Sequence, residues 1–202
     1  MPRLVGIAGQ ARMGKDSLGE AFRRVLPALR HRSFASAVKW LLAQTFQVDL
    51  SFIEAWKVKA DTPPGFEVSM RQALQTVGDG LRTIRASVWV DTALNEGVDG
   101  IFTDVRYINE AQTLRAHGGV LILIGRTVAL SDDPNPSESS LRPLLEWFLT
   151  HTNGNCVHIA GVMNAPRDAA QFDWFVRNDG ELANLELAVK TIIEHGMLQK
   201  HS

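Results

Sequence analysis

The feature that most constrains this chain is a glycine-framed loop between an apolar run and an amphipathic segment. Leu4–Ala8 is a short apolar run, which is typical of a buried strand, and Ser17–Leu29 repeats apolar residues at helical spacing. Between them stands the loop Gly9-Gln10-Ala11-Arg12-Met13-Gly14-Lys15-Asp16-Ser17. A strand, a glycine loop and a helix in this order let backbone N–H groups and a helix N-terminus bind phosphate. The first 29 residues therefore predict an α/β fold with a phosphate-binding loop.

Short apolar runs continue to alternate with helical patterns along the chain, and this predicts a parallel sheet with helices around it. We expect further strands at 31–35, 100–105, 120–125 and 173–177, and helices at 38–46, about 67–85, 109–117, 141–149 and 181–195. Gly78 and Gly80 are expected to bend or split the long helix, and 156–162 is a strand or part of a hairpin. Ligands of such sheets bind at the carboxyl ends of the strands.

Composition excludes several classes of protein. The 202 residues are 45 % hydrophobic and 21 % charged, as in one folded domain. Cys156 has no second cysteine to pair with, and we find neither a signal-peptide pattern nor an apolar run long enough for a membrane span. We expect a cytoplasmic protein, monomeric or homodimeric, that binds no membrane.

Charge is distributed unevenly along the chain. The net charge is only −1, which argues against a nucleic-acid polymer as partner. Residues 1–85 carry 13 basic and 7 acidic groups, whereas residues 86–202 carry 8 basic and 15 acidic groups. Fifteen of the 21 basic residues are arginines, whose planar guanidinium groups bind phosphate oxygens in pairs. Base composition of the genome and a solvated surface would also explain this pattern.

The phosphate-binding loop departs from the usual pattern at one position. The pattern GxxxxGK[ST] places Ser or Thr after the lysine, but here Asp16 stands there and Ser17 follows. Lys15 would reach the β- and γ-phosphates of a nucleotide. Asp16 and Ser17 are candidates for contact with Mg²⁺, and Asp16 is alternatively a helix cap. An ordinary glycine-containing turn remains the alternative for the whole loop.

Arginines gather on one face of the long helix. At about 100° per residue, Arg71, Gln75, Arg82 and Arg85 fall within roughly 40° of one direction. Arg71 is the first candidate to bind the phosphate of a second, phosphate-accepting substrate. A solvated helix face is the alternative, above all for Arg82 and Arg85.

Three further residues stand where the carboxyl ends of predicted strands should meet. Asp104 ends the strand at 100–105 and would hold a Mg²⁺-bound water or orient an arginine, and Arg106 would reach the transferring phosphate. Arg126 follows the strand at 120–125, where a mobile lid over the phosphates should begin. Aspartate–arginine pairs also brace loops, so a structural role for Asp104 and Arg106 stays open.

Several segments, in this order, resemble the phage deoxynucleoside monophosphate kinases, a branch of the P-loop nucleoside monophosphate kinases. They are the loop at 9–17, Phe34-Ala35 with Lys39, the segment 71–78 (RQALQTVG) with Arg85 and Trp89, the segment 104–110 (DVRYINE), Ser137-Glu138, and the turn Asn178–Gly180. The chain departs from the family pattern at Asn135, where histidine is frequent, and at Ile108, where proline is frequent. The first departure, at Asn135, weakens any functional role expected of Glu138.

The resemblance implies a P-loop kinase fold in a single domain, 1–202. Its central parallel sheet would have five strands, with a helical acceptor-binding region at about 36–98 and a lid at about 126–170. It implies transfer of the γ-phosphoryl group of ATP, with Mg²⁺, to a deoxynucleoside monophosphate. The residues implied for catalysis are Lys15, Arg71, Asp104, Arg106 and Arg126, and those implied for the metal are Asp16, Ser17 and Asp104. ATP would contact Gly9, Arg12, Gly14, Lys15, Asp16, Ser17, Asn178 and Gly180. The acceptor would contact Lys39, Arg71, Gln75, Arg82, Arg85 and Glu138.

Other functions stay open from the sequence alone. Another small-molecule P-loop kinase such as dephospho-coenzyme A kinase would use the same loop, although the acidic DAD-type segment expected there is missing. A non-catalytic nucleotide-binding module would not need the arginines around Arg71. A binder of single-stranded nucleic acid would interleave its basic residues with aromatic ones, which this chain does not do.

Overall fold

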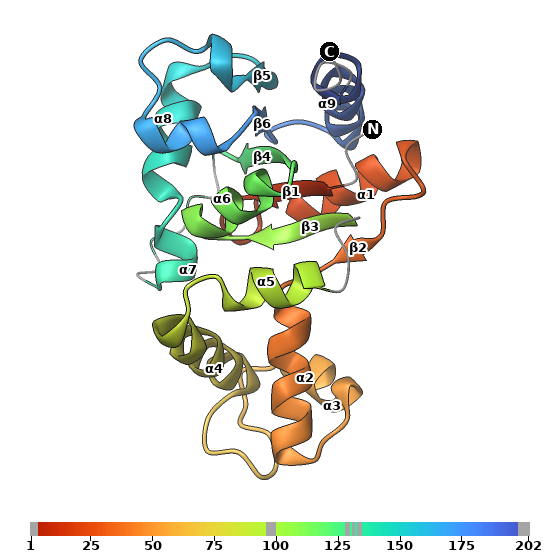
Figure 1. Ribbon diagram of the computed structural model, residues 1–202, viewed down its shortest axis with the longest axis vertical. Helices are drawn as coiled ribbons and strands as arrows, with labels where there is room; N and C mark the ends of the chain where they lie inside the picture. Colours follow the sequence, from red (N-terminus) through yellow and green to blue (C-terminus); the bar gives the residue numbers. More distant parts are fainter. Residues whose placement is uncertain (1–3, 96–99, 128–129, 131, 133–134, 198–202) are drawn as a thin grey trace. The chain divides into compact units, whose positions relative to one another are not determined.

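The computed structural model describes residues 4–95, 100–127, 130, 132 and 135–197 (Figure 1). The chain forms two compact units, one made of Met1–Arg32 with Val98–Ser202 and the other of Ser33–Gly97. In the part of the chain that the structure describes, no helix is both long enough and apolar enough to cross a membrane.

The first unit is built on a six-stranded sheet in the order β2-β3-β1-β4-β6-β5. Its strands are β1 (Leu4–Ala8), β2 (His31–Arg32), β3 (Gly100–Val105), β4 (Val120–Gly125), β5 (Cys156–His158) and β6 (Trp174–Arg177). The neighbours from β2 to β6 are parallel, whereas β5 pairs antiparallel with β6 at the edge. The five-stranded parallel sheet that we expected is therefore present, and β5 adds a sixth strand to it.

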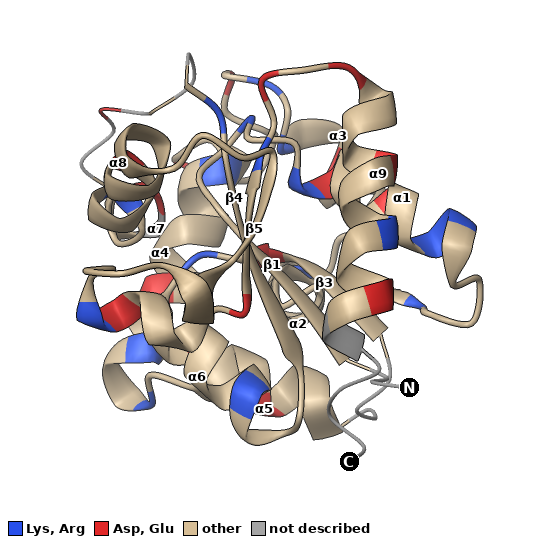
Figure 2. Ribbon diagram, turned by 90° about the horizontal axis from the view of Figure 1, so that it is seen from above, with Lys and Arg blue, Asp and Glu red and all other residues tan. Residues whose placement is uncertain are grey.

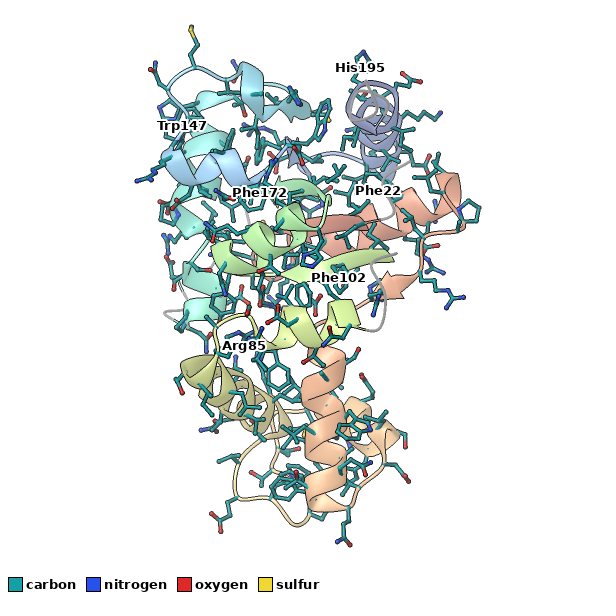
Figure 3. The ribbon with its side chains drawn as sticks, viewed as in Figure 1. Phe22, Arg85, Phe102, Trp147, Phe172 and His195 are labelled. Carbon is teal, nitrogen blue, oxygen red and sulfur yellow. The ribbon has the colours of Figure 1, made fainter. Side chains whose placement is uncertain are left out.

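Helices cover both faces of this sheet. Helix α1 (Lys15–Val25) packs beside α9 (Leu182–Ile192) on one face, and α6 (Ile108–Ala116) and α8 (Arg142–His151) cover the other (Figure 2). Every residue of β1 and β4 is buried, as expected of central parallel strands. Phe22 of α1 and Phe102 of β3 are fully buried in this core (Figure 3). The packed core thereby holds the carboxyl ends of the parallel strands together on one side of the unit.

The segment between the lid boundaries expected at 126 and 170 contains short elements. These are α7 (Pro136–Ser139), α8, β5 and two 3₁₀ turns at Ile159–Gly161 and Arg167–Gln171. The segment expected as a strand or hairpin at 156–162 is thus a strand followed by a turn. Residues 128–129, 131 and 133–134 of the expected lid lie outside the described residues.

The second unit consists of helices α2 (Ala35–Phe46), α3 (Leu50–Trp56), α4 (Met70–Ile84) and α5 (Val88–Asn95). Its core holds Leu42, Ala43, Ile53, Met70 and Ala73. Its bounds lie close to the region expected at about 36–98, of which 96–98 fall outside the described residues. The role of this unit in binding an acceptor stays a prediction.

Helix α4 corrects two expectations. It runs without interruption through Gly78 and Gly80, and the indole of Trp89 donates a hydrogen bond to the carbonyl of Gly78 at 3.0 Å. The helix ends at Ile84, which is 81 % exposed and so does not belong to the apolar face that packs on the core. The apolar spacing marked the helix correctly, but it does not show that the last apolar residue, Ile84, is left exposed.

Candidate functional site

The conformation of the loop after β1 depends on two of its glycines. Gly14 has φ +91° and begins α1, and a side chain at this position would collide with the amide of Asn178. A Cβ at Gly9 would stand 2.6 Å from the carbonyl oxygen of Ile124. The two glycines therefore allow the loop to lie close to the carboxyl end of β4, with the N-terminus of α1 open to an anion.

Lys15 is the buried cation of this loop. It is only 8 % exposed, and its Nζ donates a hydrogen bond to the carbonyl oxygen of Gln10 at 2.5 Å. Burial, and next the positive charge of Arg106, lower the pKa of Lys15 from 10.5 to about 8, against the opposing effect of Glu138, Asp16 and Asp104. An arriving phosphate would supply the negative charge that this desolvated ammonium group needs.

Glu138 braces the loop from α7. Its Oε2 accepts a hydrogen bond from the amide of Ala11 at 2.7 Å, and its Oε1 forms an ion pair with Arg106. The carbonyl of Glu138 accepts a further bond, at 2.7 Å, from Nε2 of Gln10. The residue is only 2 % exposed, and both oxygens of its carboxylate are engaged, one with the loop and one with Arg106. We expected Glu138 to bind the acceptor, and its contacts instead favour a role in fixing the loop.

Asp16 and Ser17 stand in the first turn of α1 and line the cavity beside the loop. Oδ1 of Asp16 accepts a hydrogen bond, at 2.6 Å, from the hydroxyl of Thr103 on β3. A carboxylate and a hydroxyl are the oxygen donors that Mg²⁺ prefers, and Mg²⁺ usually takes only one or two of them from the protein. These two residues therefore fit a magnesium ion that is shared with bound phosphates.

A cavity of about 380 Å³ extends from the loop to the turn after β6. It is lined by Arg12, Gly14, Lys15, Asp16, Ser17, Arg126, Asn178, Gly180, Leu182 and Leu185. Asn178 connects the turn after β6 with the phosphate-binding loop, since its side-chain amide donates a hydrogen bond to the carbonyl of Met13 at 2.9 Å. The guanidinium of Arg126 donates through Nε to the carbonyl of Asn178 at 2.8 Å. A lining of charged side chains together with two leucines suits a ligand that carries both phosphates and an apolar ring.

Asp104 is the penultimate residue of β3 and Arg106 directly follows the strand, so both stand at its carboxyl end, as we expected. The charge of Asp104 raises the pKa of Lys15, so the carboxylate lies within electrostatic reach of the loop. Arg106 is engaged with Glu138, and this pair braces the loop, which is the structural alternative that the sequence left open. The side chain of Arg106 remains one-third exposed, so a contact with phosphate is also open to it.

The residues expected at the acceptor belong to the second unit and differ in their engagement. Arg71 has no ion-pair partner among the described residues, and Gln75 is half-buried on the same helix. Arg82 pairs with Asp79 at 3.2 Å, and Lys39 pairs with Glu54 at 2.7 Å. Arg71 is therefore the residue of this set best able to take up a new anion.

Arg85 does not lie on the helix face where we placed it. It follows the last residue of α4 with an extended backbone (φ −148°), and its guanidinium pairs with Asp91 of α5 at 2.6 Å. Figure 3 labels this side chain, which is 68 % exposed. The helical projection was wrong here because the helix ends one residue earlier.

Two residues at the site were not found from the sequence. Thr103 contacts Asp16, and His31 of β2 contacts Thr103, with 3.0 Å between Nε2 and Oγ1. Neither residue carries a motif, and 87 residues separate Thr103 from Asp16. The one usable signal was the position of Thr103 beside Asp104 in the strand at 100–105.

A comparison with curated proteins agrees with the resemblance drawn from the motifs. No model of a known protein family matches the chain. A curated protein of Acanthamoeba polyphaga mimivirus, which is named by inference as a deoxynucleotide monophosphate kinase, is 27 % identical in an alignment 174 residues long. The alignment covers 76 % of this chain and 90 % of that protein. Among solved structures, a dephospho-CoA kinase from Campylobacter jejuni matches with a TM-score of 0.44 and 12 % identity over 96 % of each chain. The curated relative confirms the resemblance to the deoxynucleotide monophosphate kinases that the motifs indicated. The expected α/β fold is confirmed by the chain's own sheet, its flanking helices and the loop between β1 and α1.

Proposed function

We propose that this protein transfers the γ-phosphoryl group of ATP, with Mg²⁺, to a deoxynucleoside monophosphate. The observation that carries the proposal is the cavity in which Lys15, Arg126 and Asn178 meet beside the phosphate-binding loop. The name of the mimivirus relative supports the same substrate class. The supported class is a phosphotransferase, and the identity of the acceptor is part of the proposal.

ATP would lie along this cavity. The backbone N–H groups at the start of α1 and the ammonium of Lys15 would bind the phosphates, as in other glycine loops of this kind. Leu182 and Leu185 offer an apolar surface for the base near Asn178 and Gly180. Asp16 and Ser17 would hold Mg²⁺, which neutralises charge on the β- and γ-phosphates when it is bound.

Transfer needs positioning and positive charge more than it needs a base. A nucleoside monophosphate is largely a dianion at neutral pH, so its oxygen attacks without prior loss of a proton. Lys15 would stabilise the negative charge that develops on the transferred phosphoryl group. Arg106 and Arg126 follow the carboxyl ends of β3 and β4. Arg71 would hold the phosphate of the acceptor through its planar guanidinium.

The proposal is tested by incubating the protein with Mg-ATP and each of the four deoxynucleoside monophosphates, and by measuring ADP release. We expect ADP above background with at least one of them. Dephospho-coenzyme A serves as a fifth acceptor, and ADP release with it alone would reassign the substrate. ATP binding without ADP release from any acceptor would instead indicate a nucleotide-binding module and contradict the proposal.

Replacing Arg71 tests the acceptor site. We expect Arg71→Ala to raise KM for the monophosphate by about 30- to 150-fold, because a charge-assisted pair of hydrogen bonds contributes roughly 2–3 kcal/mol. The KM for ATP and kcat should change much less. Arg23→Ala, which removes an exposed arginine of α1, is the matched control. An Arg71→Ala enzyme with unchanged KM for the monophosphate would show that the acceptor binds elsewhere.

The lowered pKa of Lys15 predicts a pH dependence of ATP binding. Phosphate binds the protonated amine, and the free protein loses this proton as pH rises through about 8. If bound phosphate keeps the amine protonated, ATP affinity should fall about tenfold from pH 7 to pH 9. Isothermal titration calorimetry at both pH values measures the dissociation constant of ATP. An affinity that stays constant over this range would show that Lys15 is not the amine that binds phosphate.

A further inference from the structure

Asp16 occupies the position where a phosphate-binding loop normally has a hydroxyl, and the structure supplies a hydroxyl from another strand. Oγ1 of Thr103 lies 2.6 Å from Oδ1 of Asp16. Thr103 belongs to β3 and is only 4 % exposed, whereas Asp16 is exposed and lines the cavity. The carboxylate is thus anchored on one side by a buried group and open on the other.

The directions of the hydrogen bonds follow from the chemistry of the three side chains. An ionised carboxylate can only accept, so the single hydroxyl hydrogen of Thr103 is donated to Asp16. Nε2 of His31 lies 3.0 Å from the same hydroxyl oxygen. Because that hydroxyl has no second hydrogen, the imidazole must be the donor, and Nε2 carries the hydrogen. The chain of bonds therefore runs in one direction, from His31 through Thr103 to Asp16.

Packing holds the middle member of this chain in one rotamer. A Cβ placed on Gly19 of α1 would stand 2.6 Å from Cγ2 of Thr103, so the methyl group occupies the space that this glycine leaves. A β-branched side chain with its methyl group fixed has its hydroxyl fixed as well. In register, His31 pairs with Ile101, two residues before Thr103, which places both side chains on the same face of the sheet. The geometry is set by the core and not by the loop.

We propose that Thr103 and His31 are positioning residues that orient the Asp16 carboxylate as a ligand for the divalent cation of the bound nucleotide. Among the described residues, Oδ2 of Asp16 has no hydrogen-bond partner, so the second oxygen is available to a cation. Hydrogen bonds to a ligating carboxylate fix its direction, and their loss typically weakens metal binding about 10- to 100-fold. The inference rests on the proposed function only in taking a nucleotide with its cation as the ligand.

The test measures Mn²⁺ binding to the complex of the protein with ADP, using the electron paramagnetic resonance signal of free Mn²⁺. Thr103→Val keeps the shape and the methyl contact but removes the hydroxyl, and we expect it to weaken Mn²⁺ binding about tenfold. Thr103→Ser keeps the hydroxyl and should stay within about threefold of the natural protein. Asp16→Asn should lose at least as much Mn²⁺ affinity as Thr103→Val. The affinity for metal-free ADP, titrated with EDTA present, should change less than about twofold in each variant.

His31 provides an independent pair of variants on an exposed side chain. His31→Ala removes the donor and should weaken Mn²⁺ binding about threefold, whereas His31→Gln offers a new N–H donor and should restore it. This pair decides the matter if Thr103→Val does not fold. Unchanged Mn²⁺ affinity in both Thr103→Val and His31→Ala would overturn the inference, and so would an equal loss of metal-free ADP affinity, which would indicate a purely structural contact.

The outcome separates the inference from the proposed function, because the measurement uses no acceptor. Loss of Mn²⁺ affinity in a protein that phosphorylates no deoxynucleoside monophosphate would retain the inference and overturn the acceptor. Kinase activity with a Thr103→Val protein that binds Mn²⁺ normally would retain the function and overturn the inference.

Discussion

Lys15→Met should lower kcat by about 100- to 1,000-fold while leaving the protein folded. Removing one group that stabilises developing charge typically costs about 10²–10³-fold in kcat, and Lys15 is the buried cation at the centre of the loop. Methionine keeps the unbranched apolar stem and removes only the charge. The measurement is ADP release under saturating Mg-ATP and acceptor. Activity within tenfold of the natural protein would exclude Lys15 from the transfer step.

The same variant should change how stability depends on pH. Because the pKa of Lys15 is lowered to about 8 in the folded protein, against 10.5 as its ordinary value, the folded state binds this proton less tightly than the unfolded state does. The protonated amine therefore lowers the free energy of unfolding by about 3 kcal/mol below pH 8, and this cost disappears as pH rises toward 10.5. Relative to Lys15→Met, the natural protein should gain about that much stability between these pH values. Parallel stability curves, measured by urea unfolding, would contradict this.

The loop and the sheet could be predicted because local sequence determines them. Buried parallel strands are continuous apolar runs, and Gly14 is needed where the backbone enters the left-handed region, so 4–15 could be interpreted without knowing the rest of the chain. The end of α4 was harder to predict. No sequence signal marks Ile84 as the last helical residue, and one residue more or less decides where Arg85 lies.

The supports of the loop could not be predicted, because they come from distant segments. Glu138 reaches Ala11 across 127 positions, and Thr103 reaches Asp16 across 87. Their residue types are common on any surface, and only the fold brings them to the loop. A resemblance to a family can mark such a residue as notable, as it did for Glu138, but cannot say what it touches. Here the contacts favour a role in fixing the loop, and the expected role in binding the acceptor stays a prediction.

Glu138→Ala tests the role in fixing the loop and should affect stability as well as ATP binding. The substitution leaves the amide of Ala11 without its acceptor and Arg106 without its partner. Loss of a buried, hydrogen-bonded carboxylate of this kind should lower the free energy of unfolding by about 2–3 kcal/mol. Glu138→Gln, which retains an acceptor for Ala11 but not the charge, should lose less.

The kinetic constants distinguish the two roles of Glu138. If the residue fixes the loop, Glu138→Ala raises the dissociation constant of ATP about tenfold or more, in titrations without an acceptor, because the loop must then be ordered on binding. If it binds the acceptor instead, KM for the monophosphate rises and ATP binding is unchanged. A double-mutant cycle with Arg106→Ala adds a second criterion, since contacting residues of one network show coupling of about 0.5–3 kcal/mol. Additive effects on stability would contradict the ion pair, and normal ATP binding by Glu138→Ala would return the residue to the acceptor site.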